Sequence, residues 1–100
     1  MRPYRNLKIA SVIEHELGNL LIREFDFENA IVTIVGVEVS PDLMQAKIKL
    51  GIIPFEKSPE IFKLIEEKRR ELQHKLLKKM NIRPMPRLKF VLRQAQDTPE

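Results

Sequence analysis

The segment IVTIVGVEVSPDLMQAKIKLGI, residues 31–52, decides the fold of this chain. Its first part, Ile31–Val39, is mostly β-branched and apolar on both faces, which predicts a strand in a central position of a sheet. Ser40-Pro41-Asp42 predicts a turn, because proline fixes φ and aspartate bonds to nearby backbone. From Met44 to Ile52 apolar and polar residues alternate, which predicts a half-buried second strand. We therefore expect a β-hairpin.

Amphipathic helices are expected on both sides of this hairpin. Between residues 7 and 25 apolar side chains recur in steps of three and four, which predicts a helix that ends near Glu24. A longer pattern of the same kind runs from Pro59 to Met80, and Ser58 is expected to cap its start. Each helix has one apolar face, so each must be covered by another element.

Two cations interrupt the apolar stripe of the longer helix. At the helical rotation of 100° per residue, Lys68 and Arg69 lie within about 60° of Ile65, beside the residues that face the core. Either their aliphatic stems lie along the edge of the core, or the helix bends there and turns both side chains outward. The sequence leaves both possibilities open.

A third strand is expected after this helix. Pro84 and Pro86 disfavour helix in the residues before them, and residues 87–93 then alternate between apolar and basic side chains. The predicted fold class is α+β, a three-stranded sheet with helices packed on one face. We expect residues 1–93 to form one domain. Residues 94–100 lack periodicity and are expected to be a disordered tail.

Positive charge is concentrated in the last third of the chain. The 100 residues contain 18 Lys+Arg and 14 Asp+Glu, and residues 63–93 alone contain eleven basic and three acidic residues. Helical pairing with those three carboxylates leaves most of the cations unneutralised. The excess favours an anionic partner, and contact with the backbone of structured RNA fits better than base stacking, because tryptophan is absent and tyrosine occurs once. The alternative is a protein-interaction module whose basic helix binds an acidic protein.

The sequence contains no pattern that indicates catalysis or a cofactor. It has no cysteine, which excludes disulfides, thiolate metal sites and cysteine nucleophiles. His15-Glu16 is not followed by the second histidine that a zinc motif requires, and no serine has a histidine at triad spacing. No stretch is apolar enough to span a membrane. We expect a cytoplasmic monomer that is not an enzyme and takes no cofactor, metal or small-molecule substrate.

The element order and several short strings resemble the ribosome-binding factor A family. The strings are Val37-Glu38-Val39-Ser40, Asp42-Leu43 and Ala46-Lys47 in the hairpin, and Ile82-Arg83, Pro86, Leu88 and Phe90 around the last strand. The resemblance covers about residues 5–92. It implies a type II K-homology-like fold with a mixed sheet in the order α-β-β-α(-α)-β. It also implies non-catalytic binding to the rRNA of the immature small ribosomal subunit during late maturation or processing.

The charge distribution and the resemblance indicate the same segment as the rRNA-binding site. The predicted contacts are Lys68, Arg69, Arg70, Lys75, Lys78, Lys79, Arg83, Arg87 and Lys89. Lys68, Arg69 and Arg70 are the first choice, because cations placed near an apolar seam must serve something other than packing. Family members usually have Ala-x-Gly at these three positions, where their helix kinks. The resemblance therefore does not decide whether this helix is straight or bent.

Overall fold

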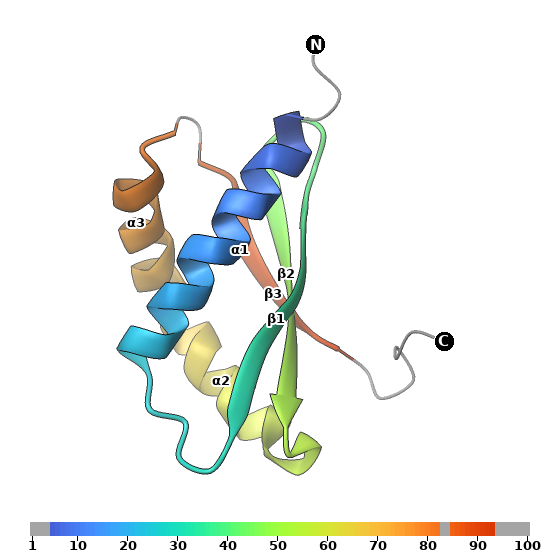
Figure 1. Cartoon of the computed structure of the whole chain (residues 1–100), viewed down its shortest axis with the longest axis vertical. Helices are drawn as coiled ribbons and strands as arrows, with labels where there is room; N and C mark the ends of the chain where they lie inside the picture. The colour runs from blue at the N-terminus through green and yellow to red at the C-terminus, as the bar shows by residue number, and fades with distance from the viewer. Residues whose placement is uncertain (1–4, 83–84, 94–100) are drawn as a thin grey trace.

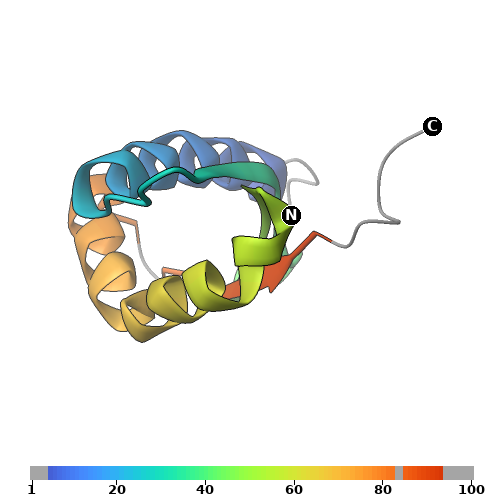
Figure 2. The ribbon, with the colours of Figure 1, turned by 90° about the horizontal axis from the view of Figure 1, so that it is seen from below.

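The computed structural model describes residues 5–82 and 85–93, and it confirms the expected α+β fold. Within these residues the elements are α1 (Arg5–Glu24), β1 (Ile31–Val39), β2 (Gln45–Ile53), the 3₁₀ helix η1 (Phe55–Lys57), α2 (Ser58–Glu67), α3 (Arg69–Met80) and β3 (Arg87–Leu92). Figures 1 and 2 show the helices on one side of the sheet. The tail expected at residues 94–100 lies outside the described residues.

The sheet has the strand order β1-β2-β3 and is mixed. β1 pairs with β2 in antiparallel orientation, and β2 pairs with β3 in parallel orientation. The prediction that Ile31–Val39 is a central strand is wrong, because β1 lies at the edge of the sheet. Its outward apolar side chains face solvent, with Ile31 59% and Val35 40% exposed. Helices cover only one face of the sheet, so even the central strand β2 alternates between buried and exposed residues.

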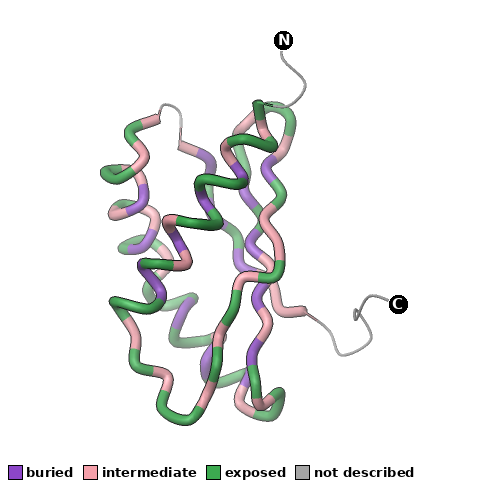
Figure 3. The backbone as a smooth tube through the Cα atoms, viewed as in Figure 1, coloured by how far each residue is buried: buried purple, intermediate pink, exposed green. Residues whose placement is uncertain are grey.

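The hydrophobic core lies between the helices and the covered face of the sheet. Every main element contributes at least one buried apolar residue, and Figure 3 shows the buried positions facing one another. Leu17 of α1, Ile48 of β2, Ile65 of α2, Leu72 of α3 and Leu88 of β3 are at most 1% exposed. The core therefore fixes the helices against one face and leaves the opposite face of the sheet open.

The long basic helix is broken at Lys68, as the second of the two possibilities left open by the sequence requires, but Arg69 is not turned fully outward and remains partly buried. Lys68 has φ −100° and ψ 7°, and it separates α2 from α3. Its backbone N–H donates to the Ile65 carbonyl at 3.0 Å, so the last turn of α2 is tightened to an i→i+3 bond. Ile65 and Leu72, on either side of the break, are both buried, while the Lys68 side chain is 56% exposed and the Arg69 side chain 33%.

The two ends of this pair of helices are capped differently. The prediction that Ser58 caps the helix is wrong, because Ser58 is its first residue and Lys57 occupies the N-cap position. The Ser58 hydroxyl is buried and has no hydrogen-bond partner among the described residues. At the other end, Asn81 adopts a left-handed conformation with φ 53°, and its N–H donates to the Leu77 carbonyl at 2.8 Å. This bond caps the C-terminal end of α3.

The position of α1 over the sheet can be tested with two leucines of the same helix. We expect Leu17→Ala to lower the free energy of unfolding by about 2–5 kcal/mol, because the side chain is fully buried. Leu7→Ala is the matched control, and since Leu7 is 65% exposed we expect a change of about 0.5 kcal/mol or less. Urea denaturation followed by circular dichroism measures both. Equal losses in the two variants would contradict this packing.

Candidate nucleic-acid interface

The structure divides the predicted rRNA contacts between two surfaces. Six of them lie on α3 or at its start: Lys68, Arg69, Arg70, Lys75, Lys78 and Lys79. Arg87 and Lys89 instead project from the open face of the sheet, because they alternate with buried residues of β3. Figures 1 and 2 show α3 on the opposite side of the molecule from β1 and β2, whereas the start of β3 is hydrogen-bonded to α3 through Gln73. Arg83 lies outside the described residues.

Carboxylates lie close to several cations of α3. Three pairs are separated by 3.7–3.9 Å: Lys68 and Glu71, Arg69 and Glu66, and Lys79 and Glu16. All three pairs are partly exposed to solvent, where such contacts contribute about 0–1 kcal/mol. These cations are therefore held only weakly, and a phosphate group can replace the carboxylates.

Lys75 has a different position, because it joins α3 to the end of α1. Its Nζ donates to Glu24 Oε1 at 2.6 Å and lies 3.3 Å from Glu71 Oε2. The hydrogen bond from Lys75 lowers the pKa of Glu24, and the hydrogen bond to Glu24 raises the pKa of Lys75. Both groups are therefore charged at neutral pH. Lys75 links two helices and is less available to a ligand than its neighbours.

Arg70, His74 and Lys78 form a stripe along the solvent side of α3. They are four residues apart, so they lie on one face of the helix, and all three are exposed. Among the described residues, no carboxylate oxygen lies within 4.0 Å of the charged groups of Arg70 or Lys78. We call these two cations the α3 pair: both are exposed, and neither has a carboxylate partner among the described residues.

The prediction missed two lysines that belong to the second surface. Lys47 and Lys49 alternate with buried residues of β2 and therefore point toward the open face. The parallel register places Lys47 opposite Lys89, and Gln45 opposite Arg87. We call Lys47, Lys49, Arg87 and Lys89 the sheet-face cluster. The alternation of charge in residues 44–52 was visible in the sequence, but the parallel pairing that unites it with β3 was not.

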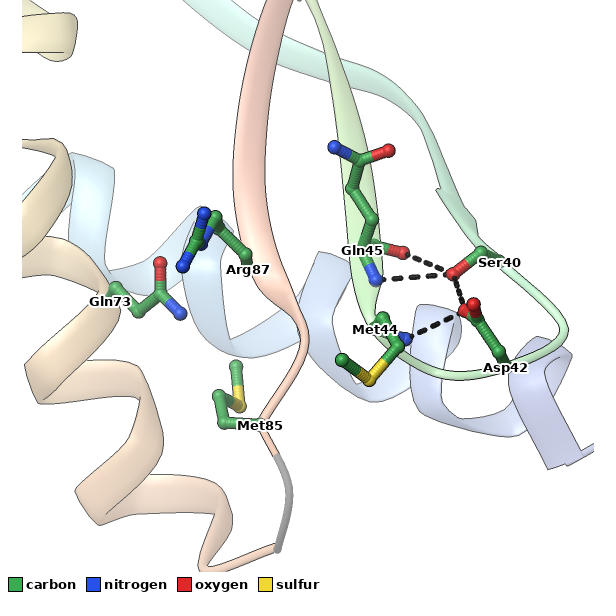
Figure 4. A pocket seen from close by; sticks show the side chains of 7 residues that line it. All are labelled: Ser40, Asp42, Met44, Gln45, Gln73, Met85 and Arg87. Atoms are coloured by element: carbon green, nitrogen blue, oxygen red, sulfur yellow. Dashed lines mark hydrogen bonds between the residues drawn. The ribbon is translucent and has the colours of Figure 1, made fainter.

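A hollow of about 540 Å³ lies beside this cluster, where β2 and β3 begin. Figure 4 shows the residues that line it: Ser40, Asp42, Met44, Gln45, Gln73, Met85 and Arg87. Asp42 accepts hydrogen bonds from the Ser40 hydroxyl at 2.6 Å and from the Met44 N–H at 3.0 Å. These bonds lower the pKa of Asp42, so its carboxylate is ionised at neutral pH and does not suit a general acid.

Gln73 closes the side of the hollow formed by α3. Its Nε2 donates to the Pro86 carbonyl at 3.1 Å, and its Oε1 accepts from the Leu88 N–H at 3.1 Å. Both polar atoms of the amide are thus used to hold α3 against the outer edge of β3. Gln45 and Arg87 also line the hollow, and both belong to the open face of the sheet.

In residues 5–82 and 85–93, no three His, Cys, Asp or Glu side chains lie close enough to hold a metal ion. In that same part of the chain, no helix combines the length and the apolar composition needed to cross a membrane.

The sequence matches a known family over most of its length. Residues 5–98 match the family model described as ribosome-binding factor A. Ribosome-binding factor A of Bordetella petrii is 36% identical over 90 residues, which cover 89% of this chain and 65% of the relative. The protein of that name from Flavobacterium psychrophilum is 30% identical, over 97% of this chain and 78% of the relative. The chain thus spans about two thirds of the length of the Bordetella protein.

Solved structures of similar fold bear the same name. The crystal structure of ribosome-binding factor A from Thermus thermophilus matches with a TM-score of 0.76 and 18% identity, over 89% of this chain and 97% of that one. A homology model of the Thermus thermophilus factor, fitted into a cryo-EM map of its complex with the 30S subunit, gives 0.71 and 16%, over 91% and 93% of the two chains. These matches confirm the expected K-homology-like fold.

The bridge between Lys75 and Glu24 predicts a pH-dependent contribution to stability. Because the folded-state pKa of Glu24 is lowered, the stabilisation is present above the ordinary value of 4.5 and is lost as pH falls through the lowered value. We expect Lys75→Met to reduce Tm by about 1–5 °C at pH 7 and by less at acidic pH. Thermal melts followed by circular dichroism measure this difference.

The matched control is Lys78→Met on the exposed side of the same helix. Since no carboxylate among the described residues pairs with Lys78, its Tm should stay close to that of the original protein at both pH values. A loss for Lys75→Met that does not change with pH would contradict the bridge.

Proposed function

Because the chain belongs to the ribosome-binding factor A family, we propose that it binds the immature small ribosomal subunit through its rRNA and assists late maturation or processing. The family match over residues 5–98 is the observation that carries this proposal. The fitted Thermus thermophilus relative, which is in complex with the 30S subunit, supports the same partner. In this proposal the protein acts in the cytoplasm and does not catalyse a reaction.

The cations of the described surface are the proposed contacts to rRNA phosphates. Among the predicted residues these are Lys68, Arg69, Arg70, Lys78, Lys79, Arg87 and Lys89. Binding of these cations to phosphates releases the counterions condensed on the RNA. The affinity should therefore rise as the salt concentration is lowered. Lys75 stays a predicted contact, although its bond to Glu24 gives it a second role. Arg83 also stays a prediction.

The absence of catalysis in this proposal is supported by the chemistry of the hollow beside the sheet. Asp42 is the one carboxylate among its lining residues, and hydrogen bonds within the turn hold it in the ionised state. The amide of Gln73 is likewise bonded to backbone. These groups stabilise the ends of the strands and are not poised to transfer a proton.

The α3 pair provides the direct test of rRNA binding. We expect Arg70→Glu/Lys78→Glu to weaken co-sedimentation with immature small subunits about tenfold or more, because two phosphate contacts become repulsive. The slope of log Kd against log salt should fall by about two. Lys8→Glu/Arg23→Glu on α1 is the matched control, since it makes the same change in net charge at two other exposed residues.

Competition distinguishes rRNA from an acidic protein partner. Purified rRNA of the small subunit should displace the protein from subunits. Displacement by an acidic protein but not by rRNA would favour the protein-interaction alternative. If the original protein did not co-sediment with immature small subunits at any salt concentration, the proposed function would be wrong.

A further inference from the structure

We propose that the open face of the sheet is a second rRNA-docking surface, so that the domain holds two separate segments of rRNA backbone, one on the sheet and one on α3. This inference rests on the proposed function and deepens it by naming the number and position of the contacts. It gives the sheet-face cluster, including the two lysines of β2, a direct role in binding.

The strand register brings the cluster into one compact area. Lys47 and Lys89 are direct neighbours across the β2–β3 pair. Arg87 is two residues before Lys89 on β3 and lies on the same face of the sheet. Neighbouring strands are about 4.8 Å apart, and residues two positions apart on one strand are separated by about 6.7 Å. From the level of Arg87 to that of Lys49 the cations therefore follow the strands for about 13 Å. This is a continuous positive strip across two strands.

The described residues leave the positive charge of this strip largely unneutralised. Glu38 of β1 lies 3.9 Å from Lys47, which is a weak exposed contact. No carboxylate among the described residues lies within 4.0 Å of the charged groups of Lys49, Arg87 or Lys89. Lysines placed opposite each other on paired strands destabilise the free sheet. A bound polyanion would relieve this repulsion, whereas helix cations near Glu66 and Glu71 have partners already.

The shape and composition of the face fit an RNA backbone better than single-stranded bases. A sheet that stacks bases presents aromatic side chains, but the aromatic residue of β3, Phe90, is buried on the covered face. Beyond the cluster, a Cβ at Gly51 would approach Thr33 Oγ1 and Val35 Cγ1 at 3.3 Å, so the neighbouring strand already fills the space beside this position. The lysines and arginine of the open face suit the phosphates along the wide, shallow minor groove of an RNA helix.

The two surfaces lie on different elements and face different directions. The sheet-face cluster lies on the uncovered face of β2 and β3, and the α3 pair lies on the exposed side of α3, which packs against the edge of β3 through Gln73. The cations of each surface point away from the core. An RNA helix docked on the sheet therefore leaves α3 free to bind a second segment, and the domain would hold the two segments in a fixed relation.

Stoichiometry with a short RNA duplex tests this inference. At low salt the original protein should bind two duplexes, which native mass spectrometry can count. Lys47→Glu/Lys89→Glu and Arg70→Glu/Lys78→Glu should each bind one. The control Lys8→Glu/Arg23→Glu should still bind two. Lys47→Gln/Lys89→Gln removes the charge without adding carboxylates, so a partial loss in this variant, with an unchanged Tm, separates binding from folding.

Binding to immature small subunits gives the second readout. We expect Lys47→Glu/Lys89→Glu to raise Kd about tenfold and to reduce the salt slope by about two, as for the α3 variant. If the original protein bound one duplex, or the sheet variant still bound two, the inference would be overturned. A sheet variant that lost subunit binding but kept both duplexes would also overturn it and would indicate a protein contact.

The outcomes separate this inference from the proposed function. If the α3 variant loses binding to subunits while the sheet variant keeps it unchanged, the second surface is wrong and the function stands. If the original protein binds neither subunits nor rRNA, the function itself is wrong.

Discussion

The parallel pairing of β2 with β3 is the constraint on which the rest of the structure depends. Parallel neighbours cannot be joined by a tight turn, so the chain between Ile53 and Arg87 must return along the length of the sheet. α2 and α3 make this return on the face that α1 also covers, and Gln73 fastens α3 to the backbone of β3. The same pairing places the lysines of β2 beside the cations of β3 on the uncovered face.

The break at Lys68 follows from that crossover. Residues 58–80 as one straight helix would extend about 34 Å, longer than the strands they pack against. With the break at Lys68, α2 and α3 each follow the covered face of the sheet, and both Ile65 and Leu72 are buried in the core. Small residues are not required for this bend, because φ −100° and ψ 7° lie in a region open to residues with a side chain. Lys68-Arg69-Arg70 can therefore replace the Ala-x-Gly sequence usual in the family.

The elements of the fold could be predicted from local periodicity, but their neighbours in space could not. The bounds of β1 agree with those expected, because β-branched residues and the following turn define a strand locally. Its edge position was missed, since apolar residues such as Ile31 and Val35 are compatible with an exposed outer face. Lys47 and Lys49 were missed as part of the interface for a related reason. The local alternation of residues shows on which face of its strand a side chain lies. The residue of β3 that pairs with it depends on the whole crossover between the two strands.

The distribution of carboxylates explains why the two basic surfaces differ. α1 supplies Glu16 and Glu24 to cations of α3, so part of the positive charge of that helix serves to join the helices. In residues 5–82 and 85–93 no comparable layer lies beside the open face of the sheet, where Glu38 contacts Lys47. At physiological ionic strength exposed charges are screened over about 8 Å, which is less than the roughly 10 Å spacing of packed layers. If both surfaces bind phosphates as proposed, screening makes the electrostatic contribution of each nearly independent of the charges on the other.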